Sequence, residues 1–313
     1  MGIDRRLMIS TLAALLPAMS GCMTGRVPPL PPNAVPPRVA VASFENRSSF
    51  EGQWKLGPGM ADLLVSELVD SRNFVVLERG SLDKVVDELA RQKHRLFRPE
   101  GRVEEGRLDN AHYLIRGVIT DFSQSSGGSF WLGLRHLFID SGGYTARVGM
   151  TLTIVDIESG RIVDSVQCSG KAKAGDAYAK GSYKGIQFGG RSFFQTPLGI
   201  ATASAIRQGL HGIVKKMPRK TWMPMIAEVD GSRIVLNGGR ERGLRTGEVY
   251  QVRGEGTLVT DPLTGDILDV LPGALVGTVR IMEMRDQVSV AELVSGHGFA
   301  RGQTLERPLA MAP

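Results

Sequence analysis

The stretch from Met60 to Leu89 constrains the fold most, because the spacing of its apolar residues changes twice. Its first part has the period of a helix with one buried face, with apolar residues at Met60, Leu63, Leu64 and Leu68. A short apolar run at 74–77 then has the composition of a buried strand. A second helix follows, with Ser81 as its expected N-cap and an apolar stripe of Leu82, Val85, Val86 and Leu89. With the strand expected at 38–44, this order predicts an α/β layer and contains no catalytic motif.

Length and charge limit the class of partner. A chain of 313 residues can bury a sizeable core and form two domains. Its net charge of +6 is compatible with nucleic acid, but basic residues do not alternate with aromatic ones and no helix-turn-helix pattern occurs. We therefore expect no nucleic-acid binding. The positive charge favours a mild attraction to anionic lipid or wall polymer instead.

Residues 1–21 have the organisation of a signal peptide. A pair of arginines precedes an apolar run at 7–16, which is too short for a stable membrane span. Two small residues then precede Cys22, an arrangement that resembles the bacterial lipobox, in which cleavage exposes the cysteine for acylation. The alternative is an ordinary secretory signal that happens to contain a cysteine. We predict that Cys22 carries a lipid anchor. Because Met23 follows it in place of aspartate, the resemblance implies the periplasmic side of the outer membrane.

A proline-rich segment, 22–37, follows the anchor. Six of its residues are prolines, within VPPLPPNAVPP. Such density favours an extended chain without hydrogen bonds, so the segment is expected to be a semi-rigid tether between membrane and folded domain. A proline-rich ligand for a partner protein is the alternative.

The loop between 44 and 60 contains two aromatic residues among polar residues and glycine. We single out Phe50, Gln53 and Trp54 as a candidate constriction or docking loop. The competing interpretation is that Phe50 or Trp54 folds back and covers the α/β core.

A long period-two alternation follows, which is a β signal. Even positions are apolar: Phe130, Leu132, Leu134, Phe138, Tyr144, Ala146, Val148, Met150, Leu152 and Ile154. A membrane-crossing strand needs about 9–11 residues of such alternation, so 123–150 is a candidate membrane hairpin. A soluble hairpin packed on helices would produce the same pattern.

Residues 172–194 form the second candidate hairpin, although its apolar face consists mainly of small residues. Lys180 and Lys184 lie on its polar face. Thr196 and Pro197 then begin a helix whose expected buried face comprises Ile206, Leu210, Ile213 and Val214. The stretch 218–224 is the expected domain boundary, and the short strands and glycine turns of 225–307 predict a small all-β barrel. The fold class is therefore α+β, with a three-layer-like α/β domain at 38–217 that carries extended β-hairpins, followed by the barrel.

The chain contains none of the common catalytic or metal-binding motifs. A phosphate-binding loop, a nucleophile elbow and an HExxH zinc motif are all missing, and the five histidines have no ligand spacing. We interpret Cys168 as a small buried residue and not as a nucleophile. We expect no enzyme, no catalytic residues, no cofactor and no metal.

Several phrases resemble the curli-secretion lipoprotein family, CsgG. They are VAVASFEN, DSRNFVVLER, LIRGVITDF and LTIVDIESGRIVDS, and the resemblance covers about 38–216. It implies a homo-oligomeric ring in which the loop of Phe50, Gln53 and Trp54 narrows a pore. It also implies a lipid-facing hairpin side with Phe130, Leu132, Leu134 and Phe138, and a lumen lined by Lys180 and Lys184. The later phrases DGSRIVLNGG, ERGLRTGEVYQV and DPLTGDIL resemble the SH3-like C-terminal domain of flagellar assembly protein T.

Two classes of function follow from these expectations. The leading hypothesis is an oligomeric outer-membrane lipoprotein that acts in secretion or assembly of an envelope or extracellular structure, as a passive protein-conducting channel with a secreted or envelope protein as its partner. The alternative is a non-channel docking lipoprotein. Such a protein would be similar to the penicillin-binding-protein activator LpoB or to a flagellar or holdfast assembly factor.

Overall fold

The computed structural model describes residues 27–31, 33–104, 106–126, 129–131, 144–174, 183 and 185–308. The N-terminal unit contains β1 (Ala34–Val35), β2 (Arg38–Val41), β3 (Glu45–Asn46), α1 (Leu56–Ser71), β4 (Val75–Leu77), α2 (Leu82–Gln92), β5 (Tyr113–Ser126), β6 (Ser129–Trp131), β7 (Tyr144–Asp156), β8 (Ile162–Ala174), α3 (Arg191–Phe194) and α4 (Pro197–Lys216). The C-terminal unit contains β9 (Lys220–Thr221), β10 (Ile226–Asp230), β11 (Arg233–Leu236), the 3-10 helix η2 (Arg240–Arg242), β12 (Val249–Arg253), β13 (Thr257–Thr260), β14 (Ile267–Leu271), β15 (Leu275–Met284), β16 (Ser289–Gly296) and β17 (Thr304–Glu306).

A seven-stranded mixed sheet forms the centre of the N-terminal unit. Its order is β4-β2-β5-β7-β8, with β3 and β6 also paired to β5. Strand β2 is parallel to β4 and β5, whereas β7 and β8 are antiparallel to their neighbours. The expected mixture of helices and strands is therefore present.

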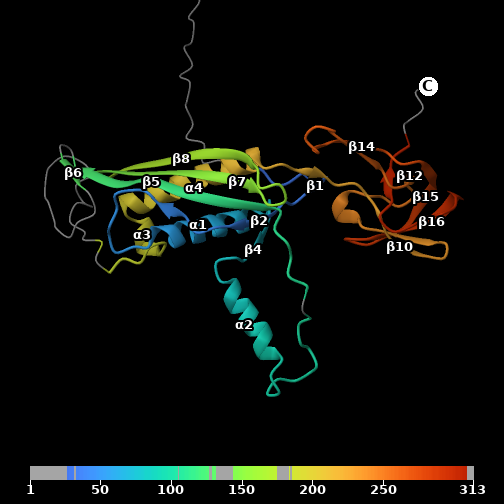
Figure 1. Cartoon of the computed structure of the whole chain (residues 1–313), viewed down its shortest axis with the longest axis horizontal. Coiled ribbons are helices and arrows are strands. Elements are labelled where there is room, and N and C mark those ends of the chain that lie inside the picture. Colours follow the sequence, from blue (N-terminus) through green and yellow to red (C-terminus); the bar gives the residue numbers. More distant parts are fainter. Residues whose placement is uncertain are drawn as a thin grey trace, which may run out of the picture.

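Helices α1 and α4 cover one face of this sheet (Figure 1). The even positions of β7 face them and are buried: Ala146, Val148, Met150, Leu152 and Ile154. In this described part of the first candidate hairpin, the period-two pattern thus reflects packing on helices. Helix α4 begins as expected, since the Thr196 Oγ1 accepts a hydrogen bond from the Gly199 N–H at 3.0 Å, and its predicted apolar face is buried.

Helix α2 differs from the expectation, because it buries none of its residues. It extends away from the sheet and from α1 (Figure 1). Val86, predicted to lie in a buried stripe, is 50% exposed, and the Ser81 side chain makes no capping hydrogen bond. The described residues of the N-terminal unit therefore form two layers, not the three-layer-like arrangement expected from the sequence. None of the described helices has both the length and the apolar character of a membrane span.

The C-terminal unit has a core of its own beneath a six-stranded antiparallel sheet. The sheet order is β10-β11-β16-β15-β12-β17. Its two outer strands approach each other, since Met225 and Thr304 form an antiparallel bridge and the Ile226 N–H donates to the Gln303 carbonyl at 2.9 Å. The core residues are Ile226, Ile234, Leu236, Leu244, Tyr250, Val252, Val279, Ile281, Ala291 and Leu305.

The proline-rich segment is bound to the protein where the structure describes it, which corrects the expectation of a chain free of hydrogen bonds over 22–37. Ala34 and Val35 form β1 and pair with β9. The Asn73 side-chain amide donates to the Pro28 carbonyl at 3.1 Å, and Val27 packs against the core. Proline removes donors but leaves carbonyl acceptors, and Ala34 and Val35 retain their N–H groups.

Candidate functional site

The candidate site lies at the end of the sheet from which both hairpin segments depart. Ser125 on β5 is opposite Thr145 on β7, and Tyr144 is opposite Ala174 on β8. The segments 127–143 and 175–182 therefore begin at the same end of neighbouring strands.

An aromatic cluster closes the core at this end. Trp54 lies at its centre, with ring centroids 5.1 Å from Phe193, 5.9 Å from Phe188 and 6.1 Å from Phe122. Phe50 is partly buried and lies 4.9 Å from Phe122 in an edge-to-face arrangement. Such pairs add about 0.5–1.5 kcal/mol beyond the area they bury. The cluster thus joins the loop before α1 to β5 and to the turn before α3.

Hydrogen bonds attach the same loop to residues 183–186. The indole Nε1 of Trp54 donates to the Ile186 carbonyl at 2.8 Å. The exposed side chain of Gln53 donates from Nε2 to the carbonyls of Tyr183 and Ile186, and the Tyr183 hydroxyl donates to the Gln124 Oε1. Gln124 and Tyr183, one in each candidate hairpin range, are therefore connected by a hydrogen bond.

Trp54 is 9% exposed, so in this structure it is a core residue. This corrects the hypothesis that it faces a pore or a partner, and it agrees with the competing interpretation that an aromatic residue of the loop covers the core. The physical reason is the set of rings from distant segments, which supplies an apolar cavity and a carbonyl for the indole N–H. Gln53 alone of the three predicted loop residues is exposed.

The sequence did not identify the partners of Trp54. Phe122, Tyr183, Phe188 and Phe193 are separated by many residues along the chain, and no local period connects them to the loop. A shallow hollow lies beside the cluster, lined by Gly59, Asp62, Leu63, Gln187, Phe188, Gly189 and Gly190.

The remaining predicted site residues are mostly outside the described part of the chain. These are Cys22, Leu132, Leu134, Phe138, Lys180 and Lys184. Phe130 lies in β6, opposite Ser125 on β5. The second candidate hairpin needs a correction at its C-terminal part, because residues 185–190 form turns and residues 191–194 form helix α3. The aromatic cluster explains this, since Phe188 and Phe193 bend the chain back onto Trp54.

Basic residues gather beside the cluster on the sheet face opposite the helices. Arg147 on β7 is directly opposite Lys171 on β8, and Lys173 follows two residues later. All three are exposed, and within the described residues none forms an ion pair. Like charges directly opposite each other destabilise a sheet. We call these three residues the basic end.

Nucleophilic chemistry has no support at Cys168. Its thiol is buried, and burial raises its pKa to about 12, so the reactive thiolate is not populated near neutral pH. Among the described residues, no group of three His, Cys, Asp or Glu side chains is placed to hold a metal ion.

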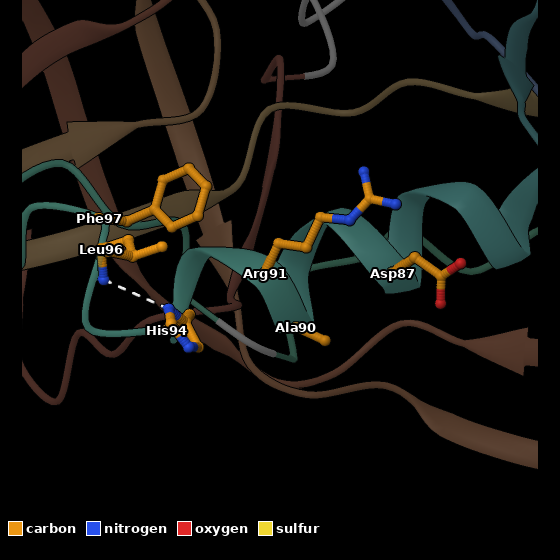
Figure 2. Close-up of a pocket in the computed structure, with 6 residues that line it drawn as sticks. All are labelled: Asp87, Ala90, Arg91, His94, Leu96 and Phe97. Atoms are coloured by element: carbon orange, nitrogen blue, oxygen red, sulfur yellow. Dashed lines mark hydrogen bonds between the residues drawn. The ribbon is translucent and has the colours of Figure 1, made fainter.

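A second hollow involves α2 and the segment after it (Figure 2). It is lined by Asp87, Ala90, Arg91, His94, Leu96 and Phe97. The Leu96 N–H approaches the His94 Nδ1 at 3.4 Å, and Leu96 itself is largely exposed. The hollow is open, and its charged groups do not converge on one point (Figure 2).

Comparison with known proteins agrees with the resemblance drawn from the sequence. A Neisseria meningitidis serogroup B protein, NMB1126/NMB1164, which carries a provisional lipoprotein name, is 27% identical over 196 residues, covering 59% of this chain and 78% of that protein. Among solved structures, the hypothetical protein CT253 from Chlamydia trachomatis is 14% identical, with a TM-score of 0.39 and coverage of 58% of this chain and 98% of that one. The PelC dodecamer from Paraburkholderia phytofirmans is 17% identical, with a TM-score of 0.30 and coverage of 59% and 91%.

The family model described as curli production assembly/transport component CsgG matches residues 28–239, which include the whole seven-stranded sheet and the aromatic cluster. The chain belongs to the CsgG family.

Proposed function

We propose that this protein is a lipoprotein of the outer membrane, anchored through Cys22 on the periplasmic side, whose copies assemble into a ring for secretion or assembly of an envelope or extracellular structure. Family membership and the lipoprotein relative support an envelope lipoprotein. The role is not enzymatic and uses no metal or cofactor. The C-terminal unit acts as a small SH3-like barrel that contributes contacts to other envelope proteins.

The departure of both hairpin segments from one end of the sheet carries this proposal. An isolated hairpin in a bilayer would leave unpaired backbone groups at its edges, each costing several kcal/mol. Pairing with hairpins of neighbouring copies removes those edges, so insertion and assembly are one event. In the resulting transmembrane barrel Phe130, Leu132, Leu134 and Phe138 face lipid, and Lys180 and Lys184 line the lumen through which an unfolded protein passes.

The burial of Trp54 bears on the choice between the channel function and the docking function. A core tryptophan leaves Gln53 as the exposed member of the predicted loop, so a constriction formed by Trp54 lacks support. The alternative, a docking lipoprotein of the LpoB kind, needs no such constriction. The exposed helix α2 offers such a protein a surface for a partner.

Cysteine labelling and electron microscopy distinguish the channel function from the docking function. Leu132→Cys and Leu134→Cys are introduced singly into a Cys168→Ser background, and the detergent-purified assembly is imaged by negative-stain electron microscopy. The channel function predicts a ring with a central pore and a membrane-protected cysteine at one or both positions. Labelling of both cysteines by a water-soluble maleimide in membranes assigns the hairpin to solvent and leaves the docking function.

The anchor is tested by fractionation. Cys22→Ala is expected to move the protein out of the membrane fraction and to remove the mass of the acyl chains. Membrane association and mass equal to those of the wild type would contradict the anchor.

A further inference from the structure

Residues 27–31 of the proline-rich segment are docked on the N-terminal unit. The Asn73 side-chain amide donates from Nδ2 to the Pro28 carbonyl at 3.1 Å, and Val27 packs against the core. Asn73 lies between α1 and β4 and is 1% exposed. The path of the tether is therefore fixed at Pro28, six residues after the expected anchor at Cys22.

The docking point and the hairpin segments lie at opposite ends of the seven-stranded sheet. Val75, two residues after Asn73, pairs with Arg38 on β2. The next residue of β2 pairs with Tyr113, the first residue of β5. The hairpin segments depart beyond Ser126, the last residue of β5. Figure 1 shows β4 and β6 at these two ends of the sheet.

The distance between the two ends exceeds the reach of the docked tether. The 14 residues of β5 rise about 3.3 Å each, so its ends lie about 43 Å apart. A barrel strand tilted by 45° still keeps them about 30 Å apart along the membrane normal. Six extended residues, from Cys22 to Pro28, span at most about 22 Å. A copy with a docked tether therefore cannot have both its lipid and its hairpins in one membrane.

Release of the tether from Asn73 restores the reach. With residues 27–33 free and β1 still paired with β9, the chain advances by twelve residues from Cys22 to Ala34. These residues span at most about 43 Å when extended, which matches the length of β5. Hairpin insertion and a docked tether thus exclude each other, whereas insertion and a released tether do not.

The docked contact contains a group that gains a hydrogen bond on release. The Asn73 Oδ1 is buried and has no hydrogen-bond partner within the described residues. A buried acceptor without a partner costs free energy, and water would satisfy it once Pro28 leaves. The prolines at 28, 29 and 31 have no N–H with which to strengthen the contact. Membrane insertion can therefore break this contact while both cores stay folded.

We propose that the tether is a length lock on membrane insertion. Docked at Asn73, it keeps the hairpin end of the sheet away from the bilayer that holds Cys22. Released, it lets the hairpins enter that bilayer, and Asn73 is the positioning residue of the lock. The inference rests on the lipid anchor and the hairpin insertion of the proposed function, and it adds the step that regulates insertion.

Cysteine labelling of the tether tests the lock in the full-length protein. Val27→Cys is introduced into a Cys168→Ser background, and its reaction with a water-soluble maleimide is timed in two preparations. One is the lipidated assembly in opened membranes, and the other is unlipidated Cys22→Ala protein in buffer. Labelling should be at least about tenfold faster in the assembly, because a side chain packed on the core reacts only when its segment opens.

A longer tether is the matched variant. Insertion of twelve glycine and serine residues after Thr24 lets the docked tether advance by eighteen residues, which span at most about 65 Å. The hairpins can then enter the membrane without release, so Val27→Cys in this assembly should label as slowly as in the unlipidated protein. Ser232→Cys, at an exposed position of the C-terminal unit, should label at one rate in all preparations.

The contrary outcomes distinguish the lock from the proposed function. Slow labelling of Val27→Cys in a ring whose Leu134→Cys is protected would overturn the lock and leave the channel. A fully labelled Leu134→Cys without rings would overturn the channel, and the lock with it. If Val27→Cys labels fast even in the unlipidated protein, the half-buried Leu30→Cys is the second reporter, and fast labelling there too would overturn the docking. Equally fast labelling with the longer tether would overturn the length argument.

Discussion

At the scale of single residues, burial decides the roles of Trp54 and Cys168. Trp54 was a candidate for function because it stands in a polar loop, yet its ring packs against aromatic residues from three other segments and its N–H finds the Ile186 carbonyl. Cys168 faces α4 from β8. Both residues serve the core.

Truncation of Trp54 should therefore reduce stability. Trp54→Ala is expected to lower the free energy of unfolding by about 3–5 kcal/mol, the range for buried aromatic side chains. Trp54→Phe keeps a ring but loses the hydrogen bond to Ile186, and should cost less. Urea unfolding followed by circular dichroism measures both. A loss below about 0.5 kcal/mol for Trp54→Ala would return the residue to the functional loop.

The thiol of Cys168 should resist modification in the folded protein. Burial keeps the reagent from the thiol and raises its pKa to about 12, so the thiol is also not ionised at pH 8. Reaction with a maleimide should require unfolding, whereas Ser169→Cys, at an exposed position next to it, should react at once. Equal rates at the two positions in native protein would contradict the burial.

At the scale of elements, helices α2 and α4 show that an apolar stripe does not by itself determine whether a helix packs against the sheet. Both stripes have helical spacing, but α4 lies against β7 and β8, whereas α2 follows a strand of three residues at the sheet edge and packs on no described element. The close contact of α4 depends on Gly170, where an added Cβ would lie 1.8 Å from the Ala201 carbonyl oxygen.

Gly170→Ala should push β8 and α4 apart. We expect a loss of about 1–3 kcal/mol in unfolding free energy from overpacking. Gly254→Ala is the matched control, because its Cβ would have its nearest neighbour at 3.6 Å, an ordinary contact. Equal stability of the two variants would show that the helix can move without cost.

At the scale of the whole molecule, polar contacts among the described residues join two separate cores. Strand β1 pairs with β9, and the Arg242 Nη1 donates to the Ala34 carbonyl at 2.9 Å. Arg161, in the turn between β7 and β8, pairs with Asp266, in the turn between β13 and β14, at 2.8 Å. The hydrogen bond from Arg161 is the main cause that lowers the pKa of Asp266.

This ion pair should loosen in acid. The pKa of Asp266 is lower in the folded protein than its ordinary value, so its stabilisation is present above that ordinary value and is lost as pH falls through the folded pKa. Hydrogen exchange of the β13 and β14 amides should therefore accelerate, relative to the intrinsic rate, at the acid end. Arg161→Gln should weaken this pH dependence and leave both cores intact, since the Thr264 hydrogen bond to Asp266 remains. An identical profile in the variant would show that the ion pair does not stabilise the hairpin of β13 and β14.

The sequence by itself determined the elements that local period and capping chemistry specify. Thr196 and Pro197 predicted the start of α4, the apolar spacing predicted α1, and the order of strands and helices indicated the family. These features depend on residues a few positions apart, so the sequence alone contains the information that specifies them.

Only the tertiary structure decided which apolar residues find a partner. It buried Trp54 and left Val86 exposed, although both are apolar side chains in polar surroundings. It also turned residues 185–194 into a turn and a short helix, and attached the proline-rich segment to Asn73 and β9. Each of these outcomes depends on contacts between segments tens of residues apart. The free energy of such contacts comes from complementary surfaces that no local pattern records.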